Sequence, residues 1–168
     1  MSTSLYDLTV PVLVRALRNL SAILKKGEAF AKETGMDPKD LIEARLFPDM
    51  GALASQIQRA SDSAKGCVVR IGGVENLAMA DTETTFDELQ ARIAATIAFL
   101  ENTPREAMDG KEETQVVLKL PNGEFPFTAT NFALGFVLPN VFFHVTTAYG
   151  ILRHKGVPLG KLDYLGGL

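Results

Sequence analysis

The sequence is short of the residues and segments on which several classes of function depend. Cys67 is the only cysteine among 168 residues, which excludes an intrachain disulfide and a thiolate-rich metal site. The first ten residues lack the basic stretch and following apolar stretch of a secretory signal. The longest apolar run, residues 132–145, is too short to span a bilayer and contains Pro139 and Asn140. We therefore expect a cytoplasmic protein that does not bind a membrane.

The sequence also has no surplus of basic residues. Its formal net charge is -3, so it carries no basic footprint for nucleic acid, and we expect no nucleic-acid partner. The hydrophobic content of 46% and the charged content of 22% are typical of a globular protein with its own core. Because there is no repeat and no long linker, residues 1–168 are predicted to form a single domain.

Motifs of several enzyme classes are missing as well. Ser61 and Ser63 have no base or oxyanion partner in view, so no hydrolase triad can be argued. The glycine pairs at 72–73 and 166–167 lack the strand and lysine of a phosphate loop. Cys67 lies among apolar neighbours and is predicted to be a small core residue. The acidic run at 81–88 is predicted to be a solvated loop and helix start.

Apolar residues recur at helical spacing in four long segments. The first ends at Gly35 and begins either near Pro11 or, with a kink there, at Ser4. In the third, Thr85 and Glu88 form a capping box, in which each side chain accepts from the other residue's backbone. Pro139 is expected to kink the last segment, which Thr130 would cap. The four predicted helices span residues 4–34, 49–71, 86–102 and 130–154.

Shorter elements lie between the long ones. Residues 37–46, opened by an Asp-Pro pair, are predicted to be a short helix, and a single helical turn follows Thr103. Residues 115–120 and 124–129 are β-prone and surround an Asn-Gly pair, which favours the left-handed geometry of a tight hairpin turn. The predicted fold is therefore all-α, an up-down four-helix bundle with a small β-hairpin between the third and fourth helices.

Polar residues on the apolar helices mark a candidate site. Asn140 and His144 lie one turn apart on the last helix, and Thr147 continues the same side. Gln56 is the matching polar residue on the second helix, next to its apolar stripe. These four residues can converge at the bundle centre and line a ligand pocket. They can equally be a structural cluster whose amides and imidazole satisfy one another, because buried polar groups need partners.

A metal is disfavoured at this site. Zinc or nickel needs three or four ligands from histidine, cysteine or carboxylate, and His144 is one ligand only. Asp49 and Asp62 are not placed by their spacing to face the same cavity as Gln56. The other histidine, His154, lies in the last helical turn, where positive charge complements the helix dipole. We expect no resident cofactor.

Four segments carry a family resemblance over nearly the whole chain. The sequence resembles the DinB/YfiT-like superfamily of four-helix bundles, and more closely an uncharacterised, domain-of-unknown-function branch associated with it. The segments are YDLTVPVLVRALRNLSAIL, ARLFPDMGALASQIQRASDSAKG, TTFDELQARIAATIAFL and FFHVTTAYGILRHKGVPLGKLDYLG.

The resemblance implies a metal site that this chain has lost in part. Many members of the superfamily hold a divalent metal through one histidine on the second helix and two, four apart, on the last. The corresponding positions here are Gln56, Asn140 and His144, so one histidine of three remains. The leading hypothesis is a metal-free bundle that binds a small molecule. One alternative is a metal-dependent hydrolase or thiol transferase, or an enzyme that uses His144 as general base.

A second alternative is a homodimeric structural or interaction module. The last helix is apolar on most of its circumference, through Phe132, Phe136, Val137, Phe142 and Phe143. Such a helix is either central in its own bundle or buried against a partner. A homodimer formed through helices would satisfy the second condition.

Overall fold

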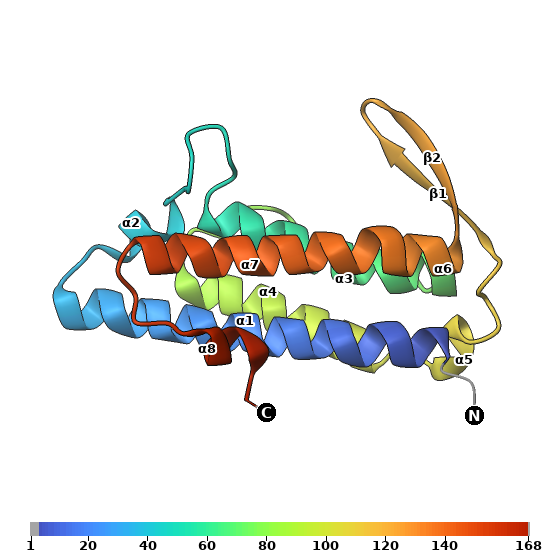
Figure 1. Cartoon of the computed structure of the whole chain (residues 1–168), viewed down its shortest axis with the longest axis horizontal. Helices are drawn as coiled ribbons and strands as arrows, with labels where there is room; N and C mark the ends of the chain where they lie inside the picture. The colour runs from blue at the N-terminus through green and yellow to red at the C-terminus, as the bar shows by residue number, and fades with distance from the viewer. Residues whose placement is uncertain (1–3, 168) are drawn as a thin grey trace.

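The computed structural model describes residues 4–167, and most of them lie in helices that run side by side (Figure 1). The long elements are α1 (Leu5–Thr34), α3 (Leu53–Gly72), α4 (Phe86–Glu101) and the run of α6 (Ala129–Asn131), the π-helical η1 (Phe132–Val137) and α7 (Leu138–His154). The expectation of a mostly helical domain is confirmed.

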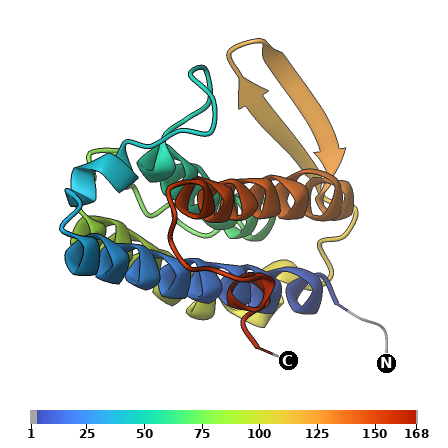
Figure 2. The same cartoon turned by 60° about the vertical axis from the view of Figure 1, so that its left-hand side comes forward.

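Shorter elements lie between the long helices in sequence or after the last of them. They are α2 (Pro38–Ile42), α5 (Arg105–Met108), α8 (Lys161–Leu165), and the antiparallel strands β1 (Gln115–Leu120) and β2 (Gly123–Thr128). The hairpin rises from the end of the molecule that also holds α5 and α6 (Figure 2). The sequence indicated α2, α5 and the hairpin, but α8 lies in the Gly- and Pro-rich tail and was not predicted.

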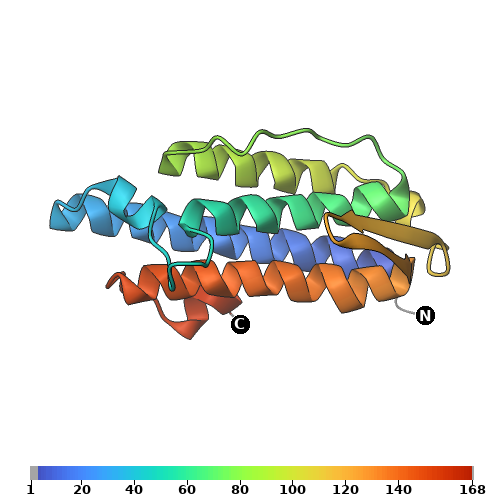
Figure 3. The same ribbon diagram turned by 90° about the horizontal axis from the view of Figure 1, so that it is seen from above.

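The up-down order predicted for the long helices is wrong between α3 and α4. Both helices end near α5: it follows α4 directly, and a side chain at Gly72, the last residue of α3, would meet Ala107. Farther back along both helices, the hydroxyls of Ser61 and Thr96 are hydrogen-bonded. They therefore run parallel, and residues 73–85 travel back along the whole bundle (Figure 3). Thirteen extended residues reach about 43 Å. The 20 residues of α3 rise only about 30 Å, so the connection is long enough for this crossover.

Helix ends that carry strong capping signals lie where expected. The Ser4 side chain accepts from the backbone of Asp7, and Gly35 ends α1 in the left-handed conformation at φ 71. Pro11 lies inside α1, in its second turn. The capping box of Thr85 and Glu88 is formed in both directions, as predicted.

The segment between α2 and α3 is longer than the sequence indicated. The short helix ends at Ile42 instead of Leu46, because Phe47 precedes Pro48 and a residue before proline disfavours helical geometry. The next helix begins at Leu53 instead of Asp49. Gly51 is a poor helix residue, and its carbonyl accepts a hydrogen bond from the side chain of Gln56. Residues 43–52 form a loop as a result.

The last long helix departs from regular geometry before its proline. Thr128, and not Thr130, is the N-cap, since its hydroxyl accepts from the backbone of Asn131. Pro139 has no N–H and its ring would press on the preceding turn of an α-helix. The backbone N–H of Leu138 bonds instead to Ala133, five residues back, which widens the helix to π geometry. In place of the kink expected at Pro139, the structure has a π-helical segment just before it.

The hairpin is confirmed, but its turn is centred one residue earlier than predicted. Leu120 pairs with Gly123, so Pro121 and Asn122 form the two-residue loop. Pro121 fixes its own φ at a negative value, and among the described residues only glycines have positive φ. The left-handed geometry expected at Asn122 is therefore wrong.

The core lies between the long helices. Leu17, Leu24, Ile57 and Leu89 are fully buried, from three different helices. The helical run Ala129–His154 is long and apolar enough to cross a membrane, a test that the core helix of a soluble protein also passes. Here it packs against α1 and α3 in a globular domain.

Candidate functional site

Two antiparallel helices, α3 and α7, carry the residues that the sequence singled out. The Nδ1 atom of His144 lies 2.8 Å from Oε1 of Gln56. The Nε2 atom of Gln56 in turn donates to the carbonyl of Gly51 at 2.8 Å. The structure therefore joins Gln56 and His144 by a direct hydrogen bond.

This pair determines which nitrogen of His144 carries the proton. The bond to Gly51 uses the amide N–H of Gln56, so its carbonyl oxygen is the atom that faces the imidazole. A carbonyl oxygen only accepts, so Nδ1 of His144 must donate. In a neutral imidazole the other nitrogen, Nε2, then holds a lone pair.

His144 is neutral at physiological pH. It is 6% exposed and Gln56 is 2% exposed. Burial, together with the positive charge of Arg59, lowers the pKa of His144 from 6.5 to about 4. The first cause dominates, because an imidazolium ion loses its hydration inside the protein.

The Nε2 atom of His144 is the reachable part of this cluster. It has no hydrogen-bond partner among residues 4–167, and it is not one of their buried unpaired atoms, so solvent reaches it. The ring of Phe143 stands edge-on to the imidazole, with centroids 5.3 Å apart, and is itself 56% exposed. The site therefore presents one hydrogen-bond acceptor beside an exposed aromatic ring.

Asn140 and Thr147 make other contacts. The Asn140 amide donates to the Ser63 hydroxyl at 2.6 Å, so it also bridges α7 to α3. Thr147 is buried and donates to the carbonyl of Phe143 within its own helix. The four predicted residues thus share one interhelical groove, but only Gln56 and His144 meet.

The donors in this groove do not fit the divalent metal of the wider superfamily. The described residues include no group of three histidine, cysteine or carboxylate side chains placed to hold an ion. The groove supplies one imidazole and two amides, and the oxygen of Gln56 is already bound to His144. Amides are poor ligands for zinc or nickel.

Several surface cavities of the described chain lie elsewhere. Four of them, of about 300, 680, 530 and 360 Å³, are lined by residues other than Gln56, Asn140, His144 and Thr147. The candidate site is therefore separate from these four cavities. Its chemistry depends on the accessible edge of His144.

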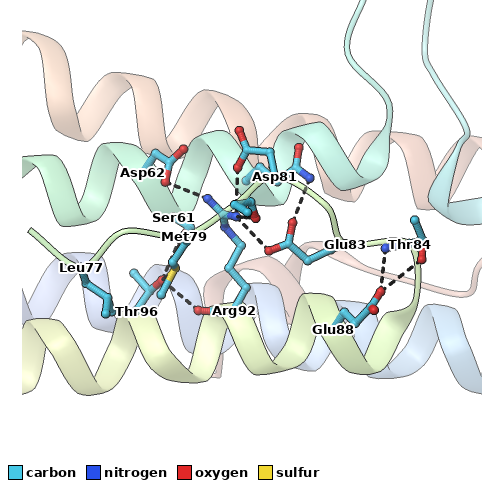
Figure 4. Close-up of polar contacts among 12 residues, drawn as sticks. Ser61, Asp62, Leu77, Met79, Asp81, Glu83, Thr84, Glu88, Arg92 and Thr96 are labelled. Atoms are coloured by element: carbon cyan, nitrogen blue, oxygen red, sulfur yellow. Dashed lines mark hydrogen bonds and ion pairs between the residues drawn. The ribbon is translucent and has the colours of Figure 1, made fainter.

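A second polar cluster lies on the other flank of α3, under the crossover (Figure 4). The Arg92 side chain is 2% exposed and forms ion pairs with Asp62, Asp81 and Glu83 at 2.7, 3.0 and 2.8 Å. Burial raises the pKa of Glu83, but the hydrogen bonds from Arg92 and Gln58 outweigh it and hold this pKa below its usual range. Lys65, also buried, pairs with Asp62.

The charged cluster fastens the crossover to the bundle. Lys65 donates to the carbonyl of Leu77, and Arg92 donates to that of Ala80. Both Asp81 and Glu83 were expected to be solvated, yet Glu83 is only 12% exposed. The signal was present in the sequence, since Arg92 lies three residues after Leu89 on the apolar stripe of α4.

The remaining candidates are structural. Cys67 is fully buried, which raises the pKa of its thiol to about 12 and leaves no thiolate at neutral pH. His154 is exposed in the last turn of α7. Ser61 shares a buried hydrogen bond with Thr96.

Comparison with known proteins relates the chain to a family model and to solved structures. Residues 5–165 match the model described as Domain of unknown function (DUF1993). A DinB family member protein from Shewanella denitrificans is 40% identical, with a TM-score of 0.89, over 98% of this chain and 93% of that one. No curated protein matches the chain.

Proposed function

The chain belongs to the DUF1993 family and is a DinB-like domain, and on this basis we propose that it binds a small molecule between α3 and α7 without a metal. We treat its four long helices as a DinB-type four-helix bundle. The site is the position where the superfamily keeps its metal. Here His144 would hold the ligand, and Gln56, Asn140 and Thr147 would position it.

The observation that carries this proposal is the unpaired Nε2 atom of His144. Gln56 and Gly51 fix the tautomer, and burial keeps the ring neutral, so a lone pair faces the groove at physiological pH. Fixing a ring in this way means that binding costs little further ordering.

The surroundings of Nε2 favour a particular kind of ligand. The lone pair accepts a hydrogen bond, so the ligand needs a hydroxyl or N–H group. The exposed ring of Phe143 offers an apolar surface beside it. Arg59 is close enough to lower the pKa of His144, so a negative group on the ligand would be attracted. A small planar acid with a donor group meets all three conditions.

A thermal-shift screen of metabolites tests the proposal, with His144→Leu as the variant. The matched control is His154→Leu, which removes the exposed histidine of the same helix. We expect at least one donor-bearing acid to raise the Tm of the wild type and of His154→Leu, but not of His144→Leu. No stabilising compound, or equal stabilisation of His144→Leu, would contradict the proposal.

Catalysis by His144 as a general base is the second candidate, supported by the same lone pair. A base works best when its pKa lies near the working pH. The pKa of about 4 leaves His144 a weak base at neutral pH, which favours binding over catalysis.

Zinc and nickel titrations of untagged protein test the metal-dependent alternative. Stoichiometric binding that His144→Leu abolishes would favour a hydrolase or transferase of DinB type.

A homodimer is a separate proposal that rests on exposed aromatic residues. Phe132 and Val137 are buried in the bundle, whereas Phe143 is 56% and Phe47 63% exposed. Exposed aromatic side chains are common in protein interfaces. Sedimentation at micromolar concentration is the test, and a clean monomer would count against a dimer.

A further inference from the structure

A cavity of about 300 Å³ lies between α1, α7 and α8, away from the groove of His144. Val145, the neighbour of His144, is in its wall, so the two sites face different sides of α7. The apolar part of the lining comes from Val12, Ala16, Phe142, Val145, Tyr164 and Leu165. Its volume is at the lower end of the range for ligand pockets in proteins.

The C-terminal helix α8 is a fixed wall of this cavity. Asn19 donates to the carbonyl of Tyr164 at 2.9 Å, and Arg15 donates to that of Leu165 at 2.7 Å. Gly166 then turns the chain at φ 79, where a side chain would meet Asn19 at 2.2 Å. Figure 1 shows α8 lying along α1, far in sequence from its partner. The cavity is therefore built from both ends of the chain.

Arg15 is the charged residue at this cavity, and it forms no ion pair with the carboxylates of the described residues. Within residues 4–167 no carboxylate lies within 4.0 Å of Arg15, whereas Arg18, one turn along α1, pairs with Glu101. A guanidinium group has five N–H donors, and the bond to Leu165 leaves donors for a ligand. The polar residues of the cavity are Arg15 and Asn19, so its charge is positive and its walls are apolar.

We propose that this cavity binds a carboxylic acid with a short apolar body. The carboxylate would bond to the guanidinium of Arg15, which matches the planar geometry of a carboxylate. The apolar body would lie against Ala16, Phe142 and Tyr164. The charge complementarity of Arg15 selects an acid over a neutral apolar molecule of the same length.

Octanoate is the probe for this site, and its binding is measured by NMR titration of the backbone amides around Ala16 and Val145. The variant is Arg15→Gln, and Arg18→Gln is the control on the same exposed face of α1. We expect Arg15→Gln to weaken binding about tenfold, because a charge-assisted hydrogen bond is lost. Arg18→Gln should leave the affinity of octanoate unchanged.

Two further measurements separate the charge from the apolar contact. Octanamide, the neutral analogue, should bind the wild type about tenfold more weakly than octanoate does. The two compounds should bind Arg15→Gln with equal affinity. Ala16→Leu should fill the cavity and abolish binding while circular dichroism reports an unchanged helix content. Failure of the wild type to bind octanoate, equal affinity for octanamide, or an equal loss in Arg18→Gln would overturn the proposal. His144→Leu should bind octanoate normally, which separates this site from the groove.

Discussion

Two polar clusters flank α3, and they differ in charge and in what they leave unpaired. Toward α7, Gln56 and His144 form a neutral cluster whose Nε2 atom is open to solvent. Toward α4, Arg92 and its carboxylates form a charged cluster in which Nε of Arg92 is buried without a hydrogen-bond partner among the described residues. A buried unpaired atom costs stability and meets no ligand, whereas an exposed acceptor can bind one.

Burial alone does not distinguish the two clusters, whereas the partners of their buried groups do. The Arg92 side chain is as well buried as Gln56 and His144, but the donors of the charged cluster bind backbone carbonyls of the crossover and its own acids. The bonds of the charged cluster therefore hold residues 73–85 against α3 and α4. In the neutral cluster the bonds of Gln56 orient His144 and leave one acceptor over, which is what a binding site needs.

The largest loss of stability is expected from a substitution that breaks the charged cluster. Arg92→Met keeps the length of the side chain but leaves Glu83 nearly buried without its cation. We expect the free energy of unfolding to fall by about 2–4 kcal/mol, less than for a fully buried network because Asp62 and Asp81 are half exposed. Urea denaturation measures it. Arg18→Met, which breaks an exposed pair with Glu101, should cost under about 1 kcal/mol. Equal losses would contradict the structural role of Arg92.

The second prediction gives the neutral cluster a charge. Gln56→Glu places a carboxylate against Nδ1 of His144, where Oε1 now lies at 2.8 Å. An opposite charge at this distance favours the imidazolium, so we expect the pKa of His144 to rise by at least about 1 pH unit. An NMR titration of the ring protons measures it. An unchanged pKa would mean that Gln56 does not face His144 in solution.

The third prediction concerns stability in acid. The pKa of His144 is about 4 in the folded chain and near 6.5 in the unfolded one, so the unfolded chain takes up the proton first. The contribution of the neutral ring is complete above pH 6.5 and is lost as the pH falls toward 4. We expect a loss of about 1–2 kcal/mol, reduced by the solvent at Nε2. His144→Leu should lack this loss in urea titrations at pH 7 and pH 4.5, and an identical loss would contradict it.

The smallest effect belongs to the second bridge of the neutral cluster. Asn140→Ala and Ser63→Ala each remove one partner of the 2.6 Å hydrogen bond between α7 and α3. In a double-mutant cycle we expect a coupling of about 0.5–1 kcal/mol, since both side chains are half buried. A coupling indistinguishable from zero would remove Asn140 from the groove.

Local signals in the sequence predicted much of the fold and half of the site. The cap at Thr85, the stop at Gly35 and the apolar stripes are set by neighbouring residues, so they could be read directly. Gln56 and His144 were found because each interrupts an apolar stripe. Their meeting needed only that α3 and α7 pack face to face, as they do.

The rest depended on long-range packing that residue spacing does not encode. Residues 73–85 carry no signal for their direction, so the parallel run of α3 and α4 could not be predicted. Arg92 finds its partner Asp62 only across that arrangement, and Ser63 finds Asn140 only across the packing of α3 on α7. The π-helical segment before Pro139 is a further case, since the proline announced a disturbance and not its geometry.

The tautomer of His144 tests the central claim most directly. A long-range ¹H–¹⁵N correlation spectrum of protein labelled at histidine distinguishes a protonated ring nitrogen from one with a lone pair, and His154→Gln removes the only other histidine signal. At pH 7 we predict a proton on Nδ1, an unprotonated Nε2, and a titration midpoint near 4. A proton on Nε2, or a midpoint at the ordinary value of 6.5, would contradict the account of His144 as a fixed, neutral acceptor.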